Sequence, residues 1–107
     1  MDNKNDYEYI CYIIEKEVSD KLEIFKKMII DFGMYQIGDK FYYIVISFRP
    51  EGFLVTIEDN KYHGEFDEKF MDKANSMGMD MHQAKLTAIM CTFRKALEIE
   101  IESAELT

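Results

Sequence analysis

The sequence predicts an α+β protein in which a small antiparallel sheet of two or three strands is packed by an N-terminal and a C-terminal helix, in the order α-β-β-α. Three patterns favour this class: helically spaced apolar residues before residue 33, β-branched and aromatic residues over 41–57, and a second helical pattern after Asp80. The 107 residues, 48% of them hydrophobic, are typical of one folded domain, residues 1–107.

The first third of the chain carries a long apolar stripe. Its members recur every three or four residues, which predicts one amphipathic helix over residues 6–31 that ends at Gly33: Ile10, Ile14, Val18, Leu22, Phe25, Ile29 and Phe32. Residues 7–14 also alternate as a strand would. A break near Ser19, with residues 7–14 extended, is therefore the alternative, and we favour the continuous helix. Residues 34–40, which include Gly38-Asp39, are expected to connect this helix to the sheet.

Residues 41–48 form the strongest strand pattern of the chain. Both faces of this segment are apolar, so it is expected to be central or covered on both sides. The Arg49-Pro50-Glu51-Gly52 segment predicts a turn, and residues 53–58 return as a second strand. After a turn at Asp59-Asn60, residues 61–65 are a candidate third strand.

Two helices are expected after the sheet. Asp67 caps a short one that runs to Met77, and Gly78 closes it. Asp80 starts the second, with Gln83 completing a capping box. Its residues divide into a broad apolar face (Leu86, Ile89, Met90, Phe93, Leu97), a stripe of small residues expected against the sheet (Ala84, Ala88, Cys91) and cations expected to face away (Lys85, Arg94, Lys95). Residues 98–102 are either helix or tail.

Charge and cysteine content narrow the function classes. Thirteen basic and 21 acidic residues give a net charge of −8, which disfavours direct nucleic-acid binding and suits a basic protein partner. No membrane span or secretion signal is expected, so we expect a cytoplasmic protein. Cys11 and Cys91 are expected to be reduced thiols that serve as small hydrophobic residues.

No pattern in the sequence assembles catalytic chemistry, so a non-enzymatic protein without cofactor or metal is expected. The Met-Gly-Met-Asp-Met-His segment, residues 77–82, holds soft ligands that could bind cuprous copper, although we favour a packing role for its methionines. A calcium loop starting at Asp59 fails, because Lys61, His63 and Phe70 occupy ligand positions.

Aromatic and titratable residues supply the candidate binding sites. Tyr7, Tyr9 and Tyr12 cannot all join one helix face, since residues two apart diverge by about 200°, so some of them are expected at an interface. Two further candidates are an acid/base cluster, for which a solvated hairpin end is the favoured alternative (Glu58, Asp59, Tyr62, His63, Glu65), and a ligand pocket between helix and sheet (Tyr42, Tyr62, Phe93).

Two low-charge segments, residues 9–14 and 41–48, are prone to aggregate if left uncovered. We therefore expect the helices or a second subunit to cover them, which makes a homodimer an expected state.

The segment from Gln83 to Leu97 resembles the C-terminal helix of phage ABA-sandwich-type small proteins, which carries a Thr-Ala…Ala-Ile-Cys…Ala-Leu run. Met90 separates Ile89 from Cys91 here, Thr92-Phe93 replaces small residues, and the tryptophan common in the family's strands is absent. The resemblance covers residues 19–97. It implies a phage or prophage origin and an α-β-β-α layer, and it transfers no catalytic residue.

The leading hypothesis is a non-enzymatic acidic interaction protein, a phage- or prophage-encoded modulator or inhibitor of a host protein. Its alternatives are a protein that binds or sequesters a small ligand and an immunity protein against a basic toxin.

Overall fold

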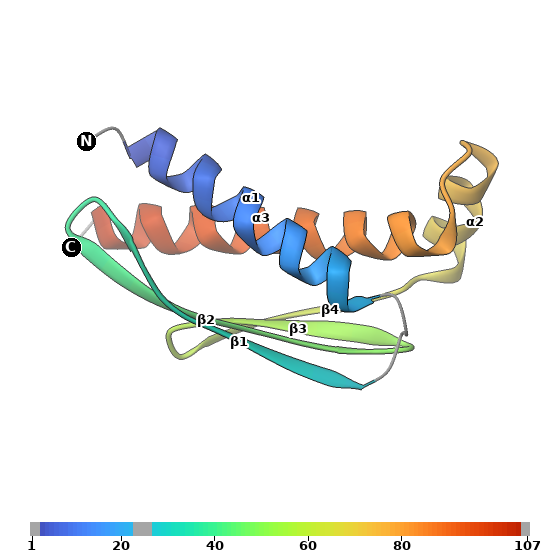
Figure 1. Ribbon diagram of the computed structural model, residues 1–107, viewed down its shortest axis with the longest axis horizontal. Coiled ribbons are helices and arrows are strands. Elements are labelled where there is room, and N and C mark those ends of the chain that lie inside the picture. Colours follow the sequence, from blue (N-terminus) through green and yellow to red (C-terminus); the bar gives the residue numbers. More distant parts are fainter. Residues whose placement is uncertain (1–2, 23–26, 106–107) are drawn as a thin grey trace.

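A computed structural model describes residues 3–22 and 27–105 of the chain. It contains four strands and three helices, in this order: α1 (Asn3–Lys21), β1 (Met28–Ile37), β2 (Lys40–Arg49), β3 (Gly52–Ile57), β4 (Asn60–Glu65), α2 (Glu68–Ser76) and α3 (Met81–Glu105) (Figure 1). The α+β class is confirmed. The sheet has four strands rather than the expected two or three, because β1 was not expected as a strand; β4 and α2 correspond to the candidate third strand at residues 61–65 and to the short helix expected after Asp67.

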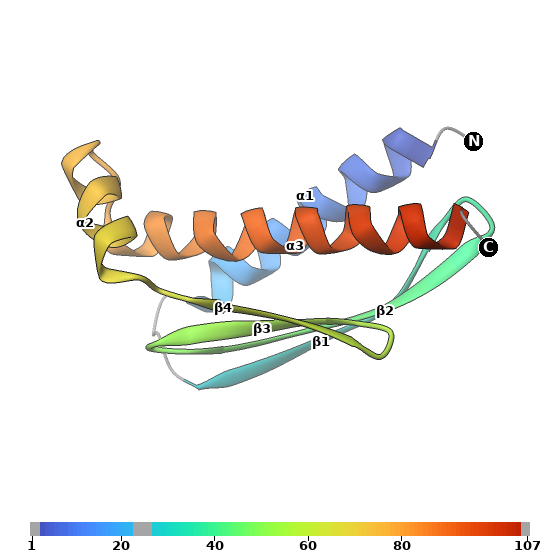
Figure 2. The same cartoon turned by 180° about the vertical axis from the view of Figure 1, so that it is seen from behind.

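The sheet is an antiparallel meander in which each strand pairs with the next, in the order β1-β2-β3-β4. Helices α1 and α3 both lie on one face of this sheet, and α2 packs against α3 at one end of the molecule (Figures 1 and 2). The side chains of α1, α3 and the covered strand face form a single hydrophobic core, whose largest fully buried members include Phe48, Phe93, Ile14 and Ile44.

The predicted helix over residues 6–31 is wrong in its last part. Ile10, Ile14, Val18 and Leu22 are buried as the stripe requires, and residues 7–14 are helical. Residues 28–31, however, belong to β1, where Ile30 pairs with Ile46 of β2. Helical spacing continued by coincidence into a segment rich in β-branched and aromatic residues, and pairing with β2 decided its conformation. Phe25 lies outside the described residues.

Gly33 does not end a helix. It lies inside β1 at a φ of 83°, next to a register shift between Asp31 and Gly33 that marks a β-bulge. The Asp31 carboxylate accepts a hydrogen bond from the Gly33 N–H, with 3.0 Å between Oδ1 and N. The predicted connector over residues 34–40 is therefore mostly strand, and the turn is confined to Gly38-Asp39.

The middle of the chain folds as expected. Strand β2 is central, Pro50-Glu51 forms its turn to β3, and the candidate third strand at residues 61–65 is β4. Strand β2 buries Tyr42, Ile44, Ile46 and Phe48, while the residues between them point to the opposite face.

Both predicted helix caps are confirmed. Asp67 Oδ1 accepts from the Lys69 N–H at 3.1 Å, and Asp80 Oδ1 accepts from the Gln83 N–H at 2.7 Å. Helix α3 runs to Glu105, so residues 98–102 are helix rather than tail.

Two details of α3 correct the expectation. Lys85 does not face away from the protein: it is buried, its Nζ donates to the Pro50 carbonyl at 3.3 Å and lies 4.9 Å from the centre of the Phe66 ring. Its long aliphatic stem allows this burial while the ammonium reaches polar and aromatic partners. Cys91 is exposed rather than packed on the sheet, because Ile89, Phe93 and Leu97 occupy the buried side of the helix. Cys11 is fully buried, as expected, and both cysteines are free thiols.

Within the described part of the chain, no helix combines the length and the apolar character needed to cross a membrane.

Candidate functional site

The outer face of the sheet, opposite the two helices, is left uncovered in the described part of the chain (Figures 1 and 2). We call it the open face. It exposes large apolar side chains to solvent: Ile29 is 66% exposed, Met34 58%, Phe41 55% and Tyr43 37%. Such residues, gathered on one side of a small protein, are typical of a surface that binds another protein.

The register of the strand pairs shows which residues lie on the open face. Side chains alternate along each strand, so the partners of exposed residues share their face. Ile29 pairs with Ser47, and Ser47 pairs with Leu54, which pairs with His63. The next row, toward the β1–β2 turn, runs through Asp31, Val45, Thr56 and Lys61. The centre of the face is therefore a mixture of half-buried apolar and small hydroxyl side chains.

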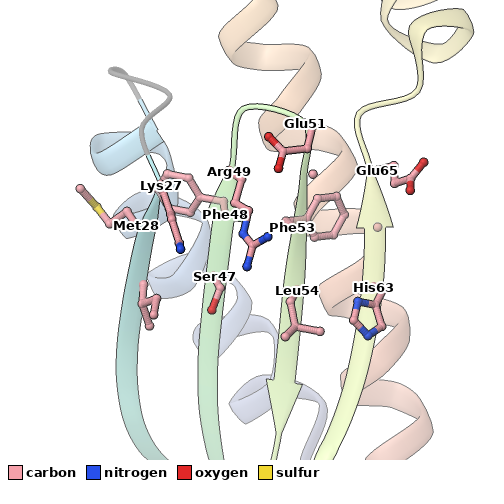
Figure 3. A pocket seen from close by; sticks show the side chains of 13 residues that line it. Lys27, Met28, Ser47, Phe48, Arg49, Glu51, Phe53, Leu54, His63 and Glu65 are labelled. Atoms are coloured by element: carbon pink, nitrogen blue, oxygen red, sulfur yellow. The ribbon is translucent and has the colours of Figure 1, made fainter.

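An open hollow of about 300 Å³ lies at the end of the sheet next to the β2–β3 turn. Figure 3 shows Ser47, Leu54 and His63 on neighbouring strands at its floor, with Lys27 on the side of β1 and Glu65 on the side of β4. Because its walls come from all four strands, the hollow is a feature of the sheet itself and exists only once the register is set.

A side-chain hydrogen bond joins β1 and β2 on the open face. The Tyr43 hydroxyl donates to Oδ2 of Asp31, while the other carboxylate oxygen holds the bulge at Gly33. This hydrogen bond raises the pKa of Tyr43, because the phenol must lose its proton next to a carboxylate. The aromatic ring is thereby held across β1 and β2 on the exposed side.

Sequence reasoning missed the residues of β1 on this face. Ile29 was assigned to a helix and Met34 to a connector, so neither was expected on a sheet. The density of β-branched and aromatic residues in 29–37, broken by a glycine, was the signal that could have revealed the strand.

The three N-terminal tyrosines do not form one site. Tyr9 and Tyr12 are exposed on α1, as an interface would require. Tyr7 is half-buried between α1 and α3, and its hydroxyl donates to the Arg94 carbonyl at 3.3 Å and to Oε1 of Glu98 at 3.2 Å. Burial is the main cause that raises the pKa of Tyr7, so this residue joins the two helices as a neutral phenol.

The three residues expected to line one ligand pocket do not share one. Tyr42 lines a hollow of about 300 Å³ between the β1–β2 turn and the end of α3, but Tyr62 and Phe93 do not line it. Tyr42 and Phe93 are buried, and Tyr62 is half-buried on the same face of the sheet. Glu100 of α3 reaches this region, where Oε1 accepts from Asn60 Nδ2 at 2.7 Å. Burial, followed by the charge of Glu100, raises the pKa of Tyr42 and of Tyr62.

The expected acid/base cluster is dispersed. Glu58 lies in the β3–β4 turn at a φ of 57°, and Oε1 of its side chain accepts from the Tyr43 N–H at 2.9 Å. Asp59 is exposed in the same turn. Tyr62 lies on the covered face, whereas His63 and Glu65 lie on the open face, because neighbours along a strand point to opposite sides.

The structure also locates His82 and the methionines of residues 77–82. His82 Nε2 lies 3.1 Å from Ser19 Oγ and joins the end of α1 to the start of α3. Met77 and Met81 are exposed, so of the three methionines only Met79 is half-buried as a packing role requires. Among the described residues, no group of three or more His, Cys, Asp and Glu side chains is placed to hold a metal ion.

Comparison with protein-family models, with curated proteins and with solved structures found no match. Functional inference for this chain therefore starts from the geometry of the open face.

Proposed function

We propose that this chain is a non-enzymatic interaction protein that binds a protein partner through the open face of its sheet. The observation that supports this proposal is the group of exposed apolar side chains on one uncovered face, Ile29, Met34, Phe41 and Tyr43. Covering them would remove apolar surface from water, which is the main driving force of protein association.

The open face differs in charge from the rest of the protein. The charged strand residues on this face are two cations, Arg49 and Lys61, and two carboxylates, Asp31 and Glu65, and they cancel. The whole chain carries −8, so the acidic excess lies elsewhere. A partner of the open face therefore needs apolar complementarity more than the basic surface that composition alone favours.

A capture experiment with matched variants tests the proposal. The purified chain is immobilised and exposed to a lysate of the cells that produce it, beside Phe41→Lys on the open face and Tyr9→Lys on the exposed side of α1. We expect Phe41→Lys to lose a specifically retained protein and Tyr9→Lys to keep it. We also expect retention to survive moderate salt, since an apolar contact is screened little.

The reverse pattern would contradict the proposal. Loss with Tyr9→Lys but not with Phe41→Lys, together with release by salt, would move the binding surface to the acidic helices and a basic partner. If the wild type retains no protein at all, further copies of the chain included, the interaction function is overturned.

A further inference from the structure

We propose that the partner seated on the open face is a second copy of this chain, with β1 of each copy lying over β4 of the other. The inference rests on the proposed function and names its partner. The two-fold axis would run along the strands, between β2 and β3, so that the two sheets stack face to face about 10 Å apart.

The charge pattern of the face is complementary to itself in this arrangement. Asp31 and Lys61 occupy opposite edge strands in the same row, which passes through Val45 and Thr56. A rotation about an axis along the strands exchanges the edges but keeps the rows. It therefore places Asp31 of one copy over Lys61 of the other, twice in the dimer.

A second pair repeats the pattern with its signs reversed. Lys27 precedes Met28, which pairs with Phe48, so it lies level with Arg49; Glu65 pairs with Gly52, which pairs with Arg49. Lys27 and Glu65 lie at opposite edges of the hollow, beside β1 and on β4, with Arg49 between them (Figure 3). The same rotation places Lys27 over Glu65 of the second copy. All four edge charges thus meet an opposite charge.

The distribution of charge also makes a second copy an acceptable neighbour. Two chains of net charge −8 repel each other, but the open face with Lys27 carries three cations against two carboxylates, so the acidic excess lies elsewhere on the molecule. Contact through this face keeps the excess charge of both copies away from the contact, where solvent and salt screen it.

The available area is of the order that a small dimer needs. The rows that all four strands share are six residues long, and strands about 4.8 Å apart that rise about 3.3 Å per residue give them a flat area on the order of 400 Å². The second copy covers Ile29 and the centre of the face, whereas Met34, Phe41 and Tyr43 lie beyond these rows on the β1–β2 hairpin. Side-chain relief increases the accessible surface beyond this flat area, toward the roughly 800 Å² per partner of a standard interface.

Pairing through a sheet edge is a poorer route to the same dimer. The edge of β1 is interrupted by the bulge between Asp31 and Gly33, and bulges disrupt the ladder that a new strand would join. The other edge, β4, is six residues long and carries Lys61, His63 and Glu65. Short, charged or bulged edges resist strand addition, so the face is the better contact.

Sedimentation equilibrium of the full chain tests the proposal with a matched pair of substitutions. Ile29→Lys adds a charge to the open face, where Ile29 is 66% exposed; Ile99→Lys makes the same change on α3, where Ile99 is 44% exposed. We expect wild type and Ile99→Lys to form a dimer in the micromolar range, and Ile29→Lys to weaken it at least about tenfold. Neither isoleucine is buried, so circular dichroism should show both variants folded.

Reversing the charges of Lys27 and Glu65 tests whether these two residues meet across the dimer. Lys27→Glu alone and Glu65→Lys alone each create two like-charged contacts and should weaken the homodimer. An equal mixture of the two single variants, and the double variant Lys27→Glu/Glu65→Lys, should regain dimerisation because every contact is again between opposite charges. A misfolded single variant could not regain it on mixing.

Several results would overturn the proposal. They are a dimer unaffected by Ile29→Lys, single charge variants whose mixture stays dissociated, and a wild-type chain that remains monomeric at roughly 100 μM. If the monomeric wild type nevertheless captures another protein in a manner that Phe41→Lys abolishes, the proposed function stands and only its partner is wrong. A monomer without such capture would overturn both.

Discussion

The residue type at position 64 is restricted to glycine by Phe53, its neighbour on the paired strand. A Cβ placed on Gly64 would lie 2.2 Å from Cζ of Phe53, because the Phe53 ring lies across the glycine on the paired strand. The same ring contacts Phe66, with 5.5 Å between ring centres. Glycine inside a strand ordinarily weakens it, but here its missing side chain leaves room for an aromatic ring.

Gly64→Ala should therefore destabilise the protein, although alanine suits a strand at least as well as glycine. We expect a loss of about 1–3 kcal/mol in the free energy of unfolding, measured by urea denaturation, because the added methyl group displaces the ring. The control is the same substitution in a Phe53→Leu background, where the shorter side chain should reduce the cost. An equal cost in both backgrounds would mean that the ring contact is not the cause.

Among the helices, strands and turns, the correct predictions are those that depend only on residues close together in the sequence. The caps at Asp67 and Asp80 and the turn at Pro50-Glu51 were all predicted, because each depends on residues at most three apart. Strand β1 was missed because its conformation depends on pairing with β2, and its apolar residues continue the spacing of the preceding helix.

Asp80→Ala should shorten or loosen the first turn of α3. The Asp80 side chain accepts from the Gln83 N–H at 2.7 Å, and alanine leaves this N–H without its side-chain partner. We expect a loss of about 1 kcal/mol in the free energy of unfolding, since α3 contributes much of the core. The measurement is urea denaturation followed by circular dichroism.

Asp80→Asn is the matched control for that substitution. Asparagine keeps an oxygen acceptor at the same position and should retain most of the stability. If Asp80→Asn is as destabilising as Asp80→Ala, the negative charge rather than the cap would be the stabilising feature.

At the scale of the whole molecule, the pKa values of the tyrosines make stability depend on alkaline pH. Burial is the first cause that raises the pKa of Tyr7, Tyr35, Tyr42 and Tyr62 above the ordinary value of 10.0. The native state therefore holds phenolic protons that the unfolded chain releases, so stability must fall as pH rises above 10. Lys85 acts in the opposite direction, because burial lowers its pKa, but it is one group against these four tyrosines together with Tyr43 and Cys11, whose pKa values are also raised.

We accordingly expect the free energy of unfolding to decrease as the pH is raised past 10. Urea denaturation on both sides of that pH, with tyrosinate absorbance followed in parallel, provides the measurement. In the native state these tyrosines should ionise at a higher pH than in the unfolded chain, and their ionisation should shift to lower pH when urea unfolds the protein. A free energy that stays constant or increases over this range would contradict the assignment of these phenols as buried and neutral.

The sequence alone predicts the α+β class, the first helix as far as Lys21, the last helix, both caps and the central hairpin, because periodicity, capping and turn chemistry act over a few residues. It also indicated that exposed tyrosines exist on the first helix. Only the tertiary structure decided that residues 28–37 are a strand, that Tyr42 and Phe93 fill the core, and that both helices cover the same side of the sheet (Figures 1 and 2). The alternation of residues along a strand shows which side chains share a face of the sheet. Which of the two faces stays uncovered depends on where helices distant in sequence pack, and patterns over a few residues do not contain that information.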